Sequence, residues 1–161
     1  MSFQVTQRPP KPTSEIPEGV TPFVIDENTA HLVTVAHRLF SRALQLRLSA
    51  HGVSVGQWPL LLHLWDQDGL TQKELSRRVH IEEPTTTRTL DRMERDGLVK
   101  RVRNPRNRRQ VNVFLTERGA DLKEELVPYA LEVNAVATFG LSEQDKAKIN
   151  SLLGYMIARL L

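Results

Sequence analysis

Apolar side chains recur at intervals of three and four residues over three long stretches of the chain, which is the pattern of amphipathic helices. The first stretch covers residues 28–50 and stops at Gly52, and the other two cover residues 116–140 and 142–161. Pro128 falls inside the second stretch, where we expect it to bend the helix. The apolar faces of the first and last stretches are broader than one neighbouring helix covers, so we expect a second chain to pack against them.

Shorter elements are predicted between these stretches. The segment "SVGQWPLLLHLWDQDG", residues 54–69, is strongly apolar. Pro59 removes a backbone donor near its start, so this helix either begins after Ser54 or is kinked there. Thr71 and Glu74 have the spacing of a capping box, in which each side chain accepts a hydrogen bond from the backbone of the other residue. A helix of about two turns is expected to follow.

A further helix and a hairpin complete the middle of the chain. Pro84 suits the first turn of a helix that ends at Gly97. Leu98, Val99 and Val102 then begin a strand. Val111, Val113 and Leu115 alternate as the return strand with one face buried, and residues 104–109 form the tip between the two strands. Two short helices joined by a tight turn make a helix-turn-helix, and a hairpin directly after it makes a winged helix. The predicted fold class is mainly α with a small β-hairpin.

The first 25 residues differ in composition from the rest of the chain. Five of the nine prolines lie in the first 22 positions with few apolar side chains, so this segment forms neither a helix nor a core. We predict a flexible or extended arm over residues 1–25 and one domain over residues 26–161. Within that domain, residues 28–50 and 117–161 are expected to form dimerisation helices and residues 54–116 the winged-helix lobe.

Positive charge is concentrated in the middle of the chain. Residues 73–118 hold 13 Lys and Arg against 7 Asp and Glu, whereas the net charge of the chain is only +3. A basic segment in an otherwise acidic chain indicates an anionic partner. The alternative is an ordinary solvated surface on which charge is unevenly distributed. The absence of Cys excludes disulfides and thiolate chemistry. No apolar run suits a membrane span or a signal peptide, so we expect a cytoplasmic protein without membrane association.

The order of these elements resembles that of the MarR family of bacterial transcriptional regulators over roughly residues 28–161. Two stretches carry the resemblance, "LTQKELSRRVHIEEPTTTRTLDRMERDGLVKR" and "NPRNRRQVNVFLTERG". The second is similar to the wing signature of the family, a D-x-R followed by alternating apolar residues and then LT-x-x-G. The segment "PTTTRTLDRMERDGLV" is especially similar to the recognition helix of the SlyA branch. Asn104 and Asn107 stand where the family usually has Asp, which leaves the wing more positive.

The resemblance implies that the N-terminal part of the second helix enters the major groove of double-stranded DNA. Arg88 in that part is suited to bond guanine O6 and N7 together. The alternative is that Arg88 pairs with Glu83 or Asp91 on its own helix. Thr86 is also a candidate for the inward face of the helix. The predicted DNA-binding residues of this helix are Thr85, Thr86, Thr87 and Arg88, and the expected phosphate contacts are Arg77, Arg78, Lys100 and Arg101.

The hairpin tip is the second predicted DNA contact. Counted back from "LT", Arg109 matches the Arg of the family's D-x-R, with Asn107 in the place of its Asp. An arginine at that position is expected to enter a narrow, A·T-rich minor groove, with Arg106 and Arg108 beside it on the DNA backbone. The alternative is a solvated tip that binds DNA only through its charge.

The resemblance also implies a homodimer and a small-molecule effector. Dimers read two half-sites about 34 Å apart, so a pseudo-palindromic operator is expected. Relatives often bind small aromatic acids between the lobe and the dimer helices, so we predict a repressor released by an aromatic acid or acyl thioester. For the Trp residues the alternative is plain core, and for Arg42 it is an ion pair. The candidate effector-binding residues are His37, Arg38, Arg42, Trp58, Leu62, Trp65 and Tyr129.

Other functions find less support in the sequence. The five His show no metal-ligand spacing, so no metal site is predicted. No nucleotide-binding loop, metalloprotease helix or nucleophile motif is present, so we expect no catalytic residues, no cofactor and no enzymatic activity. Asp66 and Asp68 are expected to be loop residues rather than paired catalytic acids. The remaining alternative is a winged helix that binds proteins without reading DNA.

Overall fold

The computed structural model describes residues 24–105 and 107–161, so most of the predicted arm and Arg106 lie outside the described residues. The chain divides into two compact units, Met1–Ala36 and His37–Leu161. The described part of the first unit holds a short 3-10 helix, Ile25–Glu27, and the start of the first long helix. Asn28 caps that helix, because its Oδ1 accepts a hydrogen bond from the His31 backbone N–H at 2.9 Å.

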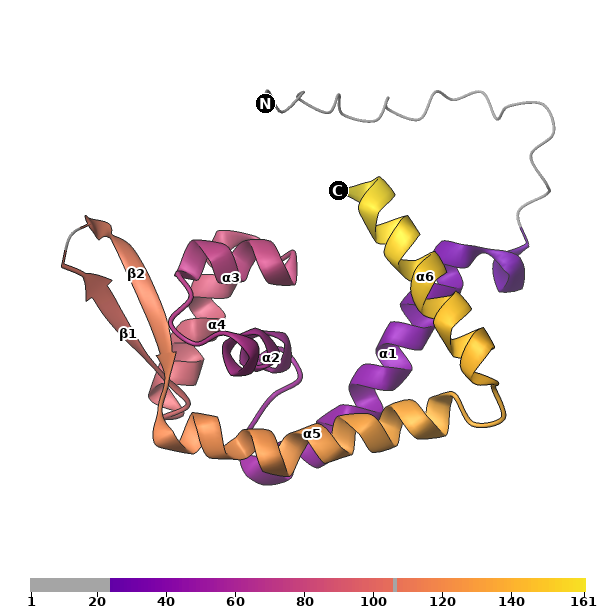
Figure 1. Ribbon diagram of the computed structural model, residues 1–161, viewed down its shortest axis with the longest axis horizontal. Coiled ribbons are helices and arrows are strands. Elements are labelled where there is room, and N and C mark those ends of the chain that lie inside the picture. The colour runs from indigo at the N-terminus through magenta and orange to yellow at the C-terminus, as the bar shows by residue number, and fades with distance from the viewer. Residues whose placement is uncertain (1–23, 106) are drawn as a thin grey trace. The chain divides into compact units, whose positions relative to one another are not determined.

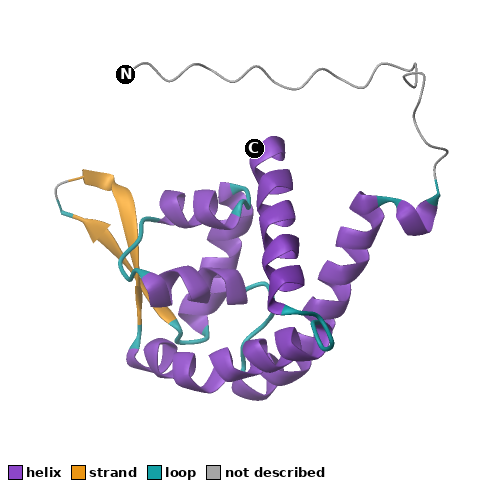
Figure 2. Ribbon diagram, turned by 45° about the vertical axis from the view of Figure 1, so that its right-hand side comes forward, coloured by secondary structure: helices purple, strands orange, loops and turns teal. Residues whose placement is uncertain are grey.

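The described residues are mainly helical, with one two-stranded antiparallel hairpin (Figures 1 and 2). This confirms the predicted fold class. None of their helices is both long and apolar enough to cross a membrane. The elements are α1 (Thr29–Leu48), α2 (Trp58–Asp66), α3 (Gln72–Val79), α4 (Glu83–Arg95), β1 (Val99–Asn104), β2 (Asn107–Leu115), α5 (Glu117–Ala137) and α6 (Glu143–Leu160).

The start of α2 settles the question that Pro59 raised. The helix begins at Trp58, and Pro59 occupies its first turn, where a missing backbone N–H costs nothing. Ser54 precedes the helix, in a turn closed by a hydrogen bond from its backbone N–H to Gln57 Oε1 at 2.8 Å. The helix therefore begins late and is not kinked at its start.

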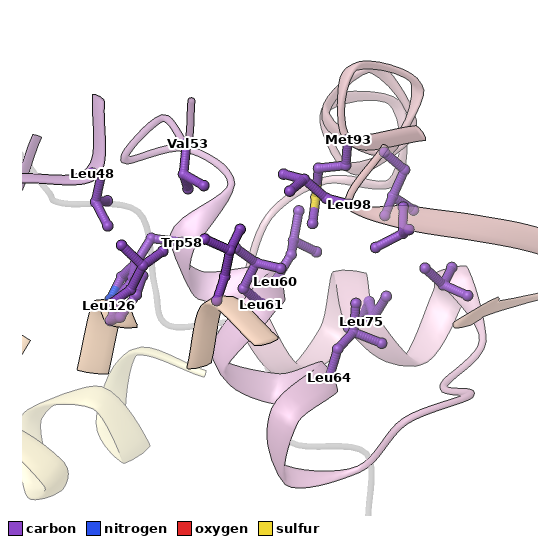
Figure 3. Close-up of a cluster of buried hydrophobic side chains, with 14 of the residues drawn as sticks. Leu48, Val53, Trp58, Leu60, Leu61, Leu64, Leu75, Met93, Leu98 and Leu126 are labelled. Carbon is purple, nitrogen blue, oxygen red and sulfur yellow. The ribbon is translucent and has the colours of Figure 1, made fainter. Parts of the chain in front are cut away.

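The core of the second unit lies where α2 packs between the helix-turn-helix and α5. The buried leucines of α2 meet Leu75 of α3 and Met93 of α4 on one side, and Leu126 of α5 on the other (Figure 3). This burial holds α3 and α4 at a fixed angle, since close-packed side chains resist displacement. The buried apolar residues are Leu44, Leu48, Val53, Trp58, Leu60, Leu61, Leu64, Leu70, Leu75, Leu90, Met93, Leu98, Val99, Val113, Leu122 and Leu126.

The hairpin is tied to the rest of the lobe by backbone hydrogen bonds at its base. The Val113 N–H donates to Leu70 O at 2.8 Å, and Thr71 forms an isolated bridge with Asn112. Asp68 Oδ1 accepts from the Leu115 N–H at 2.9 Å, so this carboxylate holds the strand, in agreement with its expected role as a loop residue. The base of the wing is thereby fixed to the segment that precedes α3.

The tip of the hairpin is shorter than predicted. We expected residues 104–109 to form the tip, but β2 already begins at Asn107, which pairs with Asn104. Arg103 pairs with Val111, so the register shifts over the intervening residues of β2. The expectation was wrong for residues 107–109 because the strand continues through polar residues, which alternation of apolar side chains does not reveal.

Both C-terminal helices begin at a side-chain cap. Thr116 Oγ1 accepts from the Gly119 N–H at 3.0 Å, and Ser142 forms a capping box with Asp145 at the start of α6. α6 has no buried residue. Its apolar side chains, such as Leu152 and Leu160 with exposed fractions of 54% and 86%, lie open in this single chain.

Candidate nucleic-acid interface

The helix-turn-helix is built from local signals that the sequence contains. The Thr71 N–H donates to Glu74 Oε2 at 2.8 Å, and the Glu74 N–H donates to Thr71 Oγ1 at 3.1 Å, which completes the predicted capping box of α3. The hydrogen bond from the Thr71 hydroxyl lowers the pKa of Glu74 below its ordinary value. His80 ends α3 in the left-handed conformation, with φ of 53°. The Ser76 hydroxyl then donates to Ile81 O, which fixes the turn before α4.

The inward face of α4 includes one of the predicted DNA-binding residues. Leu90 and Met93 are fully buried against the core. Thr86 is 1% exposed and lies on the same side, so the structure corrects its assignment as a DNA contact. A hydroxyl at that depth cannot reach a base or a phosphate. The alternative, that Thr86 faces inward, is the one that holds.

Thr87 is half-buried and tied to α3. Its hydroxyl donates to Glu83 O at 2.8 Å and accepts a short hydrogen bond from Gln72 Nε2. The single hydroxyl proton of Thr87 is therefore already used within the protein. Gln72 was missed in the sequence, because nothing in its spacing shows that its amide spans the two helices.

Two exposed arginines lie one turn apart on the outward face of α4. Thr85 and Arg88 are exposed, and Arg92 follows Arg88 one turn later. Among the residues that the structure describes, Arg88 has no ion pair, so the expected alternative of pairing with Glu83 or Asp91 is not observed. Arg92 was not among the predicted residues, although its spacing of four from Arg88 could have identified it.

Arg101 is not available as a phosphate contact. Its guanidinium lies 2.6 Å from Asp91 Oδ1 and 2.8 Å from Glu94 Oε2, and its backbone N–H donates to Glu94 Oε1 at 3.0 Å. The side chain is only 23% exposed. The structure thus corrects the sequence-based assignment: the charge of Arg101 is neutralised by two carboxylates of α4, and the residue joins the wing to that helix.

The same contacts shift the protonation of both partners. Hydrogen bonds from Arg101 lower the pKa of Glu94, and the Glu94 carboxylate raises the pKa of Arg101. Since the folded pKa of Glu94 is lowered, its contribution to stability is present above the ordinary pKa of glutamate. That contribution is lost as the pH falls through the lowered pKa.

We therefore expect part of the loss of folding stability in acid to come from the contacts of Arg101 with Glu94. Between about pH 5 and about pH 3, the urea midpoint of unfolding should fall less in Arg101→Met than in the parent protein. The other carboxylates titrate in both proteins, so the difference isolates the contribution of Glu94. Equal falls in the two proteins would show that these contacts are not linked to acid stability.

The other predicted phosphate contacts lie on the surface. Arg77 and Lys100 are exposed, and Arg78 donates to Gln67 Oε1. Arg77 lines an open polar groove of about 620 Å³ between the start of α3 and β2. The backbone of Arg108 and Arg109 belongs to β2 where the register shifts, while Arg106 lies outside the described residues.

A separate cavity of about 510 Å³ lies behind the interface, between α1, α2, α5 and the turn before α4. Two of the seven predicted effector-binding residues, His37 and Trp58, line it. The others do not, and Arg38, Arg42 and Leu62 are exposed instead. The remaining lining residues are Phe40, Ser41, Leu44, Val55, Gly56, Pro59, Ile81, Ala130, Val133 and Asn134.

The two other predicted aromatic residues, Trp65 and Tyr129, do not line this cavity and have other partners. Trp65 Nε1 donates to Gly119 O at 2.8 Å, and its ring meets that of Trp58 edge-on at 5.5 Å. The Tyr129 ring lies 5.6 Å from the Arg47 guanidinium, which pairs in turn with Glu132 at 3.0 Å. Trp65 therefore follows the alternative of plain core, and Tyr129 joins α5 to α1.

A helix-turn-helix followed by a hairpin, with exposed arginines on the outer face of its second helix, defines a winged helix of the DNA-binding class. Residues 53–111 match the model of the MarR family. The transcriptional regulator TtmR of Methylorubrum extorquens is 35% identical over 105 residues, which cover 65% of this chain and 54% of that protein. The chain thus spans about half the length of this relative.

Solved structures of such regulators have the same fold. A MarR family regulator from Listeria monocytogenes, in complex with a 26-mer DNA, matches with a TM-score of 0.79 and 21% identity over 83% of this chain and 89% of that chain. BpsR of Bordetella bronchiseptica, whose DNA binding is regulated by 6-hydroxynicotinic acid, matches with a TM-score of 0.76 and 26% identity over 84% and 97%. Residues 53–111 therefore match a MarR family domain, and the chain is similar to transcriptional regulators of that family.

Proposed function

We propose that the protein is a sequence-specific repressor that binds a pseudo-palindromic operator as a homodimer and is released by a small aromatic ligand. The observation that carries the DNA-reading part is the outer face of α4. Thr85 and Arg88 are exposed there, and Arg88 has no ion pair among the described residues. A guanidinium in this position costs little to transfer to a guanine, because no protein contact has to be broken first.

Phosphate contacts supplement this reading. Arg77, Arg78 and Lys100 extend the positive surface beside α4, and Arg92 adds a further charge on the same face. From its place in the wing signature, we assign Arg109 to the minor groove, with Arg106 and Arg108 on the backbone. These contacts set the register of the protein on DNA, while Arg88 carries the base information.

Dimerisation follows from exposed apolar surface. Leu131 and Val136 of α5 and Phe139 just after it have exposed fractions of 64%, 73% and 91%, and α6 continues this surface. A monomer rarely leaves so many large apolar side chains in water. We assign residues 28–50 and 117–161 to the dimer interface, and a stable monomer at micromolar concentration in sedimentation would contradict this.

The DNA-binding proposal is tested by selection from a random pool. The full-length protein is used to select duplexes, and the enriched duplex is compared with a scrambled one in mobility-shift titrations. We expect an inverted repeat and a preference of at least about 1,000-fold at physiological salt. Equal affinity for both duplexes would favour the alternative, a winged helix that binds proteins without reading DNA.

The cavity is our candidate for the effector site. Its volume of about 510 Å³ and its largely apolar lining suit a small aromatic molecule, and His37, Ser41 and Asn134 offer polar contacts. Ile81 lines it directly before α4, so occupancy would press on the start of the recognition helix. A ligand that binds the DNA-free arrangement better would shift the population away from DNA.

Filling the cavity should abolish the ligand response. Small aromatic acids such as 6-hydroxynicotinic acid, at about 100 times their Kd, should stabilise the parent protein by about 2.7 kcal/mol and release the selected DNA. Ala130→Phe places a ring in the cavity and should lose both effects while it still binds DNA. Ala120→Phe, on the exposed side of the same helix, is the control. If Ala130→Phe is still stabilised by the ligand and still releases DNA like the parent protein, the effector binds outside this cavity.

A further inference from the structure

Arg88 and Asp91 are potential partners that the structure keeps apart. They lie three residues apart on α4, a spacing that places opposite charges side by side on a helix and favours their pairing. Asp91 is also more than half exposed, with an exposed fraction of 55%, and so is accessible from the same face. An Asp91–Arg88 pair would occupy the guanidinium that DNA reading requires.

Arg101 takes the place of Arg88 beside that carboxylate. Its terminal nitrogen lies 2.6 Å from Asp91 Oδ1, and the same nitrogen lies 2.8 Å from Glu94 Oε2. Glu94 also receives the Arg101 backbone N–H and the Nε–H, at 3.0 and 3.1 Å. These bonds fix the guanidinium in one geometry, so it is a rigid partner for Asp91 and not a mobile surface charge.

We infer that Arg101 is a positioning residue for sequence reading: by binding Asp91, it keeps Arg88 free to contact a base. This inference rests on the proposed function, in which Arg88 reads the operator. Arg101 also cancels negative charge that would otherwise face the phosphates, because Asp91 and Glu94 lie on the helix that enters the groove. Both effects act on DNA binding through other residues, without a contact between Arg101 and DNA.

Removing the charge of Arg101 distinguishes this positioning role from a phosphate contact and from a purely structural role. In Arg101→Met the aliphatic stem is kept and the charge removed, so Asp91 becomes able to capture Arg88. We expect the preference for the selected duplex over the scrambled one to fall by about tenfold or more. In the double variant Arg101→Met with Asp91→Ala, the competitor is gone, and the preference should return to near the parent value.

Matched variants separate the possible roles. Asp91→Ala alone should keep the parent preference, because Arg88 is already free and Arg101 retains Glu94. Arg101→Lys keeps a cation beside both carboxylates and should also keep most of the preference. Thermal melts establish that each variant is folded. If Arg101→Met fails to fold, Arg101→Gln removes the charge and retains hydrogen-bonding capacity, and it is subject to the same rescue test.

The outcomes are distinct. Loss of preference in the uncharged Arg101 variant, with recovery when Asp91 is also removed, supports the inference. A uniform loss on both duplexes with a smaller salt dependence, unchanged by Asp91→Ala, would identify a phosphate contact and overturn it. If Arg88→Ala itself keeps the parent preference, the base-reading role fails and this inference fails with it. A third result separates the two claims. If Arg88→Ala loses the preference, but adding Asp91→Ala to Arg101→Met does not restore it, only the role of Arg101 is overturned and the base-reading role of Arg88 stands.

Discussion

Gly119→Ala should destabilise the protein by about 3 kcal/mol, although alanine normally stabilises a helix interior relative to glycine. The reason is the close approach of α5 to the end of the helix-turn-helix. A Cβ added at Gly119 would lie 2.0 Å from Leu98 O, and the obstacle is backbone that cannot rotate away. The Gly119 N–H also donates to Oγ1 of the helix cap Thr116, and the Gly119 carbonyl accepts the Trp65 indole N–H, so a shift of α5 would break both contacts.

Gly56→Ala is the matched control for this substitution. Gly56 has an ordinary backbone conformation, and the nearest atom to an added Cβ is Ser54 Oγ at 3.9 Å. The free energy of unfolding of Gly56→Ala should differ from that of the parent protein by no more than about 0.5 kcal/mol. Urea unfolding of both variants at one protein concentration measures the difference, since concentration matters for a dimer. An unfolding midpoint of Gly119→Ala equal to that of the parent protein would contradict the packing described for α5.

Arg88→Ala should have the largest effect on DNA binding. The proposed dimer contains two copies of Arg88, and each bidentate guanine contact contributes about 1–3 kcal/mol of discrimination. The affinity for the selected duplex should therefore fall by at least about 30-fold, whereas the affinity for the scrambled duplex should change far less. Mobility-shift titrations of both duplexes at one salt concentration measure the two effects.

Two further variants separate base reading from charge. Arg88→Lys keeps the charge but loses the planar fork, so we expect it to lose most of the discrimination. Arg92→Ala removes an exposed arginine one turn further along α4, and it should weaken binding to both duplexes alike. A similar uniform loss in Arg88→Ala would show that Arg88 contributes charge without reading a base.

Features determined by neighbours in the chain were predictable from the sequence. The capping box of Thr71 and Glu74 and the caps at Thr116 and Ser142 join residues three apart, so spacing alone identifies them. Pro84 at the start of α4 and Gly97 after its end are also local signals. The winged-helix fold was therefore predicted.

Features that depend on how helices rotate against each other were not predictable to the same degree. His37 and Ser41 line the cavity, but Arg38 and Arg42, each one position further along α1, do not. One residue turns a helix by about 100°, which is enough to move a side chain from the cavity into solvent. Periodicity identifies an apolar stripe but does not fix which edge of that stripe meets a neighbour.

The role of Arg101 was missed for a related reason. Its partner Glu94 lies seven residues away, across the turn that joins α4 to β1. The direction in which β1 leaves that turn decides whether the guanidinium meets α4 or DNA, and the packing of Leu98 and Val99 into the core sets this direction. A count of positive charges in the sequence therefore overestimated the charge available to DNA.

Protection of guanine N7 from methylation on the selected duplex tests the central claim most directly, because N7 is the major-groove atom that Arg88 is proposed to contact. The account predicts two clusters of protected guanines about 10 base pairs apart, both present with the parent protein and both lost with Arg88→Ala. Binding without protected guanines, or protection that persists in Arg88→Ala, would contradict the claim that two copies of α4 read the operator in the major groove.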